Sequence, residues 1–215
     1  MPLFPIFLKL TGRHCLVVGA GNVAESKISS LLHAQAKLTV VAPEALPGIA
    51  QQASAGQFLW EQRVFAPEDL KDVFLVIAAT SSPEVNQQVF LLASERGILC
   101  NAVDDPPNCD FYFPSIVERG ALQIAISTAG ESPALAQRLR KEIDGQLAPD
   151  LGGWLDQLGQ LRRDILQEYE PSEGRKLLLH ELASLPLCKL PACPARQRAH
   201  SAALDRTSNG KESIS

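Results

Sequence analysis

The first half of the chain alternates between short apolar runs and longer segments with helical spacing. Short continuous apolar runs bounded by glycine, proline or polar residues are typical of strands buried in a sheet. Such runs occupy residues 14–19, 38–42, 58–64, 73–79 and 98–103, and helical spacing occupies residues 22–36 and 83–96. Strands that alternate with helices over short connections predict a parallel, doubly wound α/β sheet.

After residue 113 the pattern changes. Residues 115–118 and 121–127 alternate like strands, and a polar turn leads to Ser132 and Pro133, a pair typical of the first positions of a helix. Residues 151–169 and 172–185 predict two more amphipathic helices, and the proline-rich, polar residues from 186 onward predict a disordered tail. The pattern therefore divides the chain into residues 1–113, 114–149, 150–185 and 186–215.

Composition excludes several classes of protein. Of the 215 residues, 46% are hydrophobic and 20% are charged, with a formal net charge of −4. This apolar content is too high for global disorder, and the charge balance does not indicate a nucleic-acid-binding protein. No run reaches the ~18–20 apolar residues of a membrane span, and the N-terminus lacks a cationic segment or cleavage site. We therefore expect a cytoplasmic protein with no signal peptide, no nucleic-acid partner and no membrane partner.

The cysteines and histidines do not indicate a metal site. The five cysteines form no C-x-x-C pair, and the four histidines are not clustered. Buried free thiols in a reducing cytosol are the favoured interpretation of the cysteines. We therefore expect no metal bound by protein ligands.

The first predicted strand ends in the motif Gly19-Ala20-Gly21-Asn22-Val23-Ala24, which also opens the first predicted helix. This G-x-G-x-x-A pattern favours dinucleotide binding, since Gly19 makes the tight turn and Gly21 lets the backbone approach a pyrophosphate. The helix N-terminus supplies N–H groups for the phosphates. The alternative is a strand–helix turn that needs glycine for structural reasons alone.

The end of the second predicted strand bears on the choice of cofactor. An acidic residue there binds the adenosine ribose of NAD, and Glu44 arrives after Pro43, about two residues late. No lysine or arginine lies between Thr39 and Gln62 to hold a 2′-phosphate. The sequence therefore favours NAD over NADP.

Asp104 directly follows the fifth predicted strand. The carboxyl ends of parallel strands meet at one edge of a sheet, so Asp104 is expected near the glycine motif and near Thr80. A carboxylate in that place can act as a general base. The alternative is a turn residue, because Asp-Asp-Pro-Pro is itself strong turn chemistry, and Asp105 is the better candidate for that role.

A polar loop and a basic helix follow in the second half. The loop from Ser127 and Thr128 to Pro133 can bind anions or can be an ordinary capped turn. Arg138, with its neighbours Arg140 and Lys141, can meet an acidic substrate or can form a solvated helix face.

Three segments in register resemble the precorrin-2 dehydrogenase family, which comprises single-domain enzymes and the N-terminal half of bacterial siroheme synthase. They are PIFLKLTGRHCLVVGAGNVAESKISSLL, AATSSPEVNQQV and CNAVDDPPNCDFYFPSIVERGALQIAISTAGESPALAQRLRKEI. The resemblance implies a Rossmann-type NAD-binding domain over 1–113, a small α+β dimerisation segment over 114–149 and a helical C-terminal domain over 150–185. It matches nothing in the tail, and it includes no downstream methyltransferase domain, so another protein is expected to supply precorrin-2.

The resemblance implies NAD-dependent oxidation of precorrin-2 to sirohydrochlorin, with Asp104 as the catalytic aspartate. Some members also insert Fe²⁺ to give sirohaem, so a ferrochelatase activity at the same carboxylate is a further expectation, as is a homodimer. The implied cofactor-binding residues are Gly19, Gly21, Asn22, Val23, Pro43, Glu44 and Thr80. The substrate bears eight carboxylates, so the candidate substrate-binding residues are Ser127, Thr128, Arg119 and Arg138.

Two other functions stay open from the sequence. A regulatory module that senses NAD would share the glycine motif but would not need Asp104. A ferrochelatase without redox activity would keep the glycine motif as structure only.

Overall fold

The computed structural model describes residues 3–183. The chain divides between Phe113 and Pro114 into two compact units, which we term unit 1 and unit 2. The predicted tail, residues 186–215, lies outside the described residues.

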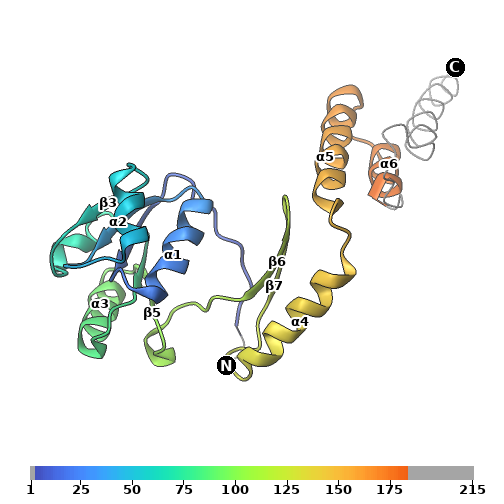
Figure 1. The fold of residues 1–215 in the computed structure, drawn as a ribbon. Helices are drawn as coiled ribbons and strands as arrows, with labels where there is room; N and C mark the ends of the chain where they lie inside the picture. The colour runs from blue at the N-terminus through green and yellow to red at the C-terminus, as the bar shows by residue number, and fades with distance from the viewer. Residues whose placement is uncertain (1–2, 184–215) are drawn as a thin grey trace, which may run out of the picture. The chain divides into compact units, whose positions relative to one another are not determined.

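Unit 1 is built on a five-stranded parallel sheet with the strand order β3-β2-β1-β4-β5 (Figure 1). The central strand β1 pairs with β2 on one side and with β4 on the other. The strands are β1 (His14–Val18), β2 (Lys37–Val41), β3 (Leu59–Glu61), β4 (Leu75–Ala78) and β5 (Leu99–Ala102). The prediction of a doubly wound parallel sheet is confirmed, and its apolar runs mark strands that are covered on both faces.

Helices cover both faces of this sheet. On one face α1 (Asn22–His33) and α2 (Pro47–Ser54) pack on a cluster that includes Val17, Val40 and Ile77, all fully buried. On the other face α3 (Pro83–Glu95) and the 3₁₀ turn η1 (Pro67–Leu70) pack on Leu16 and Val76. A second 3₁₀ turn, η2 (Pro106–Asn108), follows β5.

Several element boundaries differ from the predicted ones. The helix predicted over 22–36 ends at His33, because Gln35 takes a φ of +58° and starts the turn into β2. The strand predicted over 58–64 is ordered as a strand only at Leu59–Glu61, since only these residues pair with β2. The sequence analysis did not predict α2, whose single buried side chain, Ile49, gives no apolar stripe.

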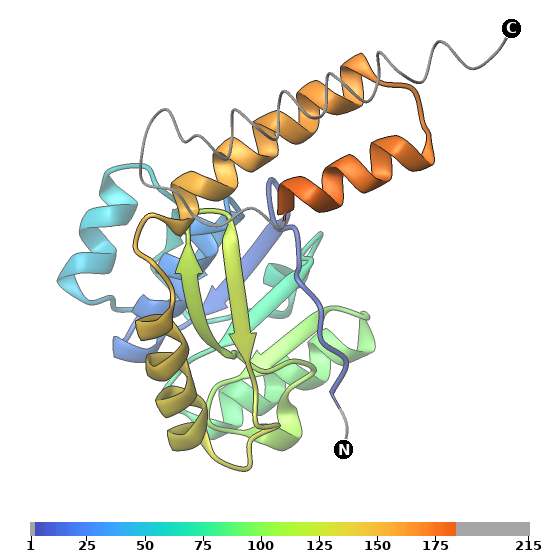
Figure 2. The same cartoon turned by 90° about the vertical axis from the view of Figure 1, so that its right-hand side faces the viewer.

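Unit 2 begins with the two predicted strands, β6 (Ser115–Arg119) and β7 (Leu122–Ile126), which pair as an antiparallel hairpin. Helix α4 (Pro133–Gln146) begins at the predicted cap, where the Ser132 hydroxyl accepts a hydrogen bond from the Leu135 N–H group. The helices α5 (Leu151–Glu168) and α6 (Glu173–Ala183) pack side by side (Figure 2). None of the helices in the described part of the chain has the length and apolar character to cross a membrane.

Two contacts hold the hairpin against the helices of unit 2. A Cβ placed on Gly152 would lie 2.9 Å from the carbonyl carbon of Arg119, so the turn of the hairpin and the start of α5 approach as bare backbone. The Arg119 guanidinium forms an ion pair of 2.8 Å with Asp144 near the end of α4. Both contacts fix the position of β6 within the unit.

Candidate dinucleotide and substrate site

The turn after β1 requires glycine at position 19. Gly19 has a φ of +107°, and a Cβ placed on it would lie 2.3 Å from the carbonyl oxygen of Ala79, at the end of β4. Its N–H group donates a hydrogen bond of 2.9 Å to the Val41 carbonyl, at the end of β2. The glycine therefore lets the chain turn between two neighbouring strands where no side chain fits.

Gly21 leaves open space at the start of α1. It is the N-cap residue of α1, no side chain caps the helix there, and a Cβ placed on Gly21 would meet no atom within 4 Å. The first N–H groups of a helix have no partner within the helix and carry its positive dipole end. Asn22 and Val23 are exposed in this first turn. These features fit the pyrophosphate of a dinucleotide, which would accept hydrogen bonds from the uncapped turn.

The residues after β2 lie beside this loop. The Leu46 N–H group donates a hydrogen bond of 3.0 Å to the Ala20 carbonyl, so the segment with Pro43 and Glu44 is tied to the glycine motif. Both residues are exposed. The Trp60 indole donates to the Ala42 carbonyl at 3.0 Å and fixes the preceding residue. This is the edge at which a Rossmann fold binds the adenosine ribose.

Thr80 is held by a buried amide that the sequence analysis missed. The Thr80 hydroxyl donates to the Asn86 Oδ1 atom at 2.8 Å, and the Asn86 Nδ2 group donates to the Thr80 carbonyl at 3.2 Å. Asn86 lies in the first half of α3 with only 6% of its surface exposed. The loop after β4 is therefore rigid next to Gly19, and no sequence motif marks an asparagine in this role.

Asp104 lies at the same edge of the sheet, two residues after β5. The Val103 N–H group donates to the Ala78 carbonyl at 2.9 Å, which aligns the end of β5 with the end of β4. Asp104 is exposed and has a φ of +61°, in the left-handed region that aspartate tolerates better than most residues. The next residue, Asp105, performs the structural role, since its carboxylate accepts a hydrogen bond of 2.6 Å from Asn108.

Two contacts with β5 anchor the loop that carries Asp104. The Asn101 side chain, 6% exposed, donates to the Phe111 carbonyl at 2.7 Å. The Asp110 carboxylate accepts a hydrogen bond of 2.9 Å from the Cys100 N–H group. The loop thus starts and ends on β5, so Asp104 is presented from a closed, supported turn.

A lysine that the sequence analysis did not single out faces this loop. The Lys27 ammonium, on α1, lies 3.6 Å from the centre of the Phe113 ring. Burial lowers the pKa of Lys27, and the negative charge of Asp104 opposes this shift. The Lys27 ammonium therefore lies over an aromatic face and is near enough to Asp104 for the two charges to interact.

The candidate substrate-binding residues of unit 2 take part in local interactions. Arg119 pairs with Asp144, and Arg138 forms an ion pair of 3.3 Å with Glu142, one helical turn later. The Ser127 hydroxyl accepts from the Ala129 N–H group, and the Thr128 hydroxyl accepts from the Ser132 N–H group. Their contact with a substrate stays a prediction.

The thiols of unit 1 are kept protonated by burial. Burial raises the pKa of Cys15 to about 11 and that of Cys100 to about 12. Over residues 3–183, no cluster of three or more His, Cys, Asp or Glu side chains is arranged to hold a metal ion.

Two family models match the chain. The family described as putative NAD(P)-binding matches residues 6–115, which cover unit 1. The family described as sirohaem biosynthesis protein central matches residues 119–146, which cover the turn of the hairpin, β7 and α4.

Curated relatives and a solved structure agree with these matches. The siroheme synthase of Photorhabdus laumondii is 43% identical over 176 residues, which cover 82% of this chain and 37% of that protein. Siroheme synthase 3 of Aeromonas hydrophila is 37% identical over 219 residues, 100% of this chain and 47% of that protein. The chain thus spans less than half of these relatives.

The solved structure of SirC, a precorrin-2 dehydrogenase, matches over 94% of this chain and 100% of its own, with a TM-score of 0.76 and 26% sequence identity. This match extends the likeness through both units. The chain therefore belongs to the family described as putative NAD(P)-binding. This is the family of the precorrin-2 dehydrogenases and of the corresponding part of siroheme synthases, as its sequence indicates.

Proposed function

We propose that this chain oxidises precorrin-2 to sirohydrochlorin with NAD⁺. The observation that carries the proposal is the register of three strands: Val18, Ala78 and Ala102 are aligned across β1, β4 and β5. The glycine turn, Thr80 and Asp104 therefore leave the sheet at one edge. A cofactor loop and a carboxylate at the same edge are what a dehydrogenase needs.

In this mechanism the chain's residues bind the cofactor and move a proton. Bound NAD⁺ would supply the acceptor for the hydride that leaves the macrocycle. The open first turn of α1 at Gly21 holds the phosphates, and the rigid Thr80 loop limits where the dinucleotide lies. The Asp104 carboxylate accepts a proton from the macrocycle as the hydride leaves. The Lys27 ammonium balances the negative charge of Asp104 and of the substrate's carboxylates.

The cofactor choice within this proposal is NAD rather than NADP. Glu44 is exposed beyond β2, where it can accept a hydrogen bond from a ribose hydroxyl and repel a 2′-phosphate. Fe²⁺ would enter as a second substrate, because the same Asp104 carboxylate can accept pyrrole protons during metal insertion.

We also propose a homodimer that forms through unit 2. A two-stranded hairpin is marginally stable alone, and its outward residue Ile116 remains 48% exposed. Pairing of two copies would cover such apolar side chains.

Free thiols at Cys15, Cys100 and Cys109 suit a reducing compartment, in agreement with a cytoplasmic enzyme.

The test is anaerobic absorbance of the purified protein with precorrin-2 and NAD⁺. We expect NADH and sirohydrochlorin to appear together, and Asp104→Asn to lower the rate by about 10³-fold, the middle of the range for loss of a general base. Asp105→Asn is the matched control, since it removes a neighbouring carboxylate but keeps an acceptor for Asn108. Fe²⁺ added to the product mixture then tests metal insertion.

Two results would contradict the proposal. Binding of NAD⁺ without turnover would favour a regulatory module. Iron insertion into sirohydrochlorin without dinucleotide binding would favour a ferrochelatase whose glycine motif is structural.

A further inference from the structure

Arg63 lies near the end of the sheet edge at which the adenosine part of the cofactor would bind. The Ala42 N–H group, just after β2, donates to the Glu61 carbonyl at 3.2 Å, and the Arg63 N–H group donates to the same carbonyl at 2.8 Å. Arg63 therefore lies in the tight turn after β3, one strand beyond the residues that would meet the adenosine ribose. An arginine near that ribose is the usual partner of the 2′-phosphate that distinguishes NADP from NAD.

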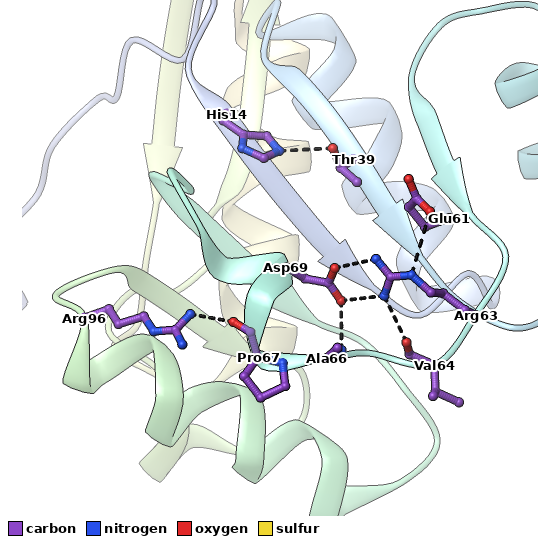
Figure 3. A network of polar contacts seen from close by, with 9 residues as sticks. All are labelled: His14, Thr39, Glu61, Arg63, Val64, Ala66, Pro67, Asp69 and Arg96. Atoms are coloured by element: carbon purple, nitrogen blue, oxygen red, sulfur yellow. Dashed lines mark hydrogen bonds and ion pairs between the residues drawn. The ribbon is translucent and has the colours of Figure 1, made fainter.

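The guanidinium of Arg63 is already bound within the chain (Figure 3). Its Nη2 and Nη1 atoms contact the two carboxylate oxygens of Asp69 at 2.6 Å and 2.9 Å. Nη1 also donates to the Val64 carbonyl at 3.1 Å, and Nε lies 3.7 Å from a carboxylate oxygen of Glu61. This is a two-point fork on one carboxylate with a second carboxylate nearby, and such charge-assisted pairs are stronger than neutral hydrogen bonds.

Asp69 is built to hold that fork. Its side chain is 9% exposed, against 44% for Arg63, and it accepts a third hydrogen bond of 2.8 Å from the Ala66 N–H group. Burial alone would raise the pKa of Asp69, but the hydrogen bonds from Arg63 and Ala66 outweigh burial and place the pKa below its ordinary value. The carboxylate is therefore charged at neutral pH, and the 3₁₀ turn η1 fixes its position.

An arginine bound in this way directs its donors to Asp69 and to the Val64 carbonyl rather than to a phosphate. A 2′-phosphate would compete with Asp69 for the guanidinium and would meet the negative charges of Asp69 and Glu61. The ribose hydroxyl of NAD carries no charge and needs no arginine. The fork therefore occupies a cation that a 2′-phosphate at this corner would otherwise use.

We propose that Asp69 makes the protein selective for NAD over NADP by holding Arg63 away from the cofactor. The inference rests on the proposed use of NAD, but it concerns dinucleotide binding and needs no tetrapyrrole substrate. Asp69 acts through Arg63 and is a positioning residue.

The test is the binding of NAD⁺ and of NADP⁺ to the full-length protein, measured separately by calorimetry without substrate. For the unaltered protein we expect NAD⁺ to bind at least about tenfold more tightly than NADP⁺, a factor typical of one charge-assisted hydrogen bond. Asp69→Ala should raise the affinity for NADP⁺ about tenfold. Asp69→Asn keeps an acceptor for the Ala66 N–H group and should give a smaller rise in a turn that folds as before.

Two further variants separate release of Arg63 from loosening of the turn. Arg63→Ala added to Asp69→Ala should abolish the gain in NADP⁺ affinity. Arg96→Ala removes a different contact of the same turn, the hydrogen bond to the Pro67 carbonyl, and should leave the ratio of the two affinities unchanged (Figure 3).

Three results would overturn the inference: equal affinities in the unaltered protein, no gain in either Asp69 variant, or a gain that persists without Arg63. Binding of neither dinucleotide would overturn it together with the proposed function. Selective binding of NAD⁺ without oxidation of precorrin-2 would contradict the proposed function alone and leave the inference supported.

Discussion

Unit 1 and unit 2 differ in how their sheets are covered. In unit 1 both faces of the sheet carry a cluster of buried residues, and the side chains of Val40 and Ile77 have no exposed surface. In unit 2 the hairpin buries Val117, while its neighbour Ile116 is 48% exposed. A sheet covered on both faces can hold a glycine turn and a carboxylate in fixed positions. A two-stranded hairpin depends on whatever covers it, so unit 2 is the place to look for a partner surface.

The largest loss of stability is expected from a substitution at the centre of unit 1. Gly19→Ala forces a side chain onto a φ of +107° and against the Ala79 carbonyl. We expect a loss of about 3 kcal/mol or more in the free energy of unfolding, measured by urea denaturation. Gly21→Ala is the control: its Cβ meets nothing, so stability should change by less than about 1 kcal/mol while NAD⁺ affinity falls. A Gly19→Ala protein of unchanged stability would contradict the prediction.

A matched pair of truncations tests the two units directly. Ile77→Ala leaves a cavity in β4 and should cost about 3 kcal/mol. Ile116→Ala removes the same atoms from an exposed position and should change stability by less than about 0.5 kcal/mol. Urea denaturation of both variants under conditions where the protein is monomeric measures the difference. Equal losses would mean that the hairpin has a core of its own.

Alkaline pH should weaken unit 1 through its buried thiols. The folded state raises the pKa of Cys15 from 9.0 to about 11, so the stabilising effect is complete below pH 9 and is lost as the pH rises toward 11. The expected loss is about 2 kcal/mol over that interval. Urea denaturation at several pH values checks it against Cys15→Ala, which should lose less stability over the same range. Parallel curves for the two proteins would refute the assignment to Cys15.

The smallest expected effect concerns the cation beside Asp104. Lys27→Met keeps an unbranched apolar side chain and removes the ammonium group that lies over Phe113, so kcat/KM for precorrin-2 should fall about tenfold. Lys37→Met is the control, because Lys37 lies at the start of β2, at the opposite end of the strand from the glycine turn. An unchanged kcat/KM in the Lys27 variant would remove this residue from the site.

The fold of unit 1 was accessible from the sequence because its signals are local. A strand buried on both faces is a continuous apolar run, and Ser82 marks the start of α3 as its capping residue, as Ser132 does for α4 in unit 2. Helix α2 was missed because one buried side chain leaves no periodicity to detect. Boundaries such as the end of α1 depend on a backbone turn that no single residue type specifies.

The candidate site was accessible only in part, for a related reason. The glycine motif and Asp104 stand at the ends of strands, so the parallel topology alone predicts that they meet. Lys27 looks in the sequence like any lysine on a helix surface, and its relation to Asp104 depends on how α1 packs. Arg63 lies one residue beyond the cation-free stretch that ends at Gln62. Its ion pair with Asp69 depends on the turn after β3, which no pattern in the sequence specifies.

The place of β1 in the middle of the sheet also determines the order in which the protein can be assembled during synthesis. Cys15 in β1 pairs with Leu75 in β4, far along the chain, and β4 in turn pairs with β5. A nascent chain can form the β1–β2 pair early. The Ala79 carbonyl, which packs against Gly19, is in place only after β4 has left the ribosome. Contacts between such distant segments form slowly. The candidate dinucleotide-binding edge is thus among the last parts of unit 1 to be completed, and a nicotinamide cofactor can stabilise the finished domain but cannot guide its early folding.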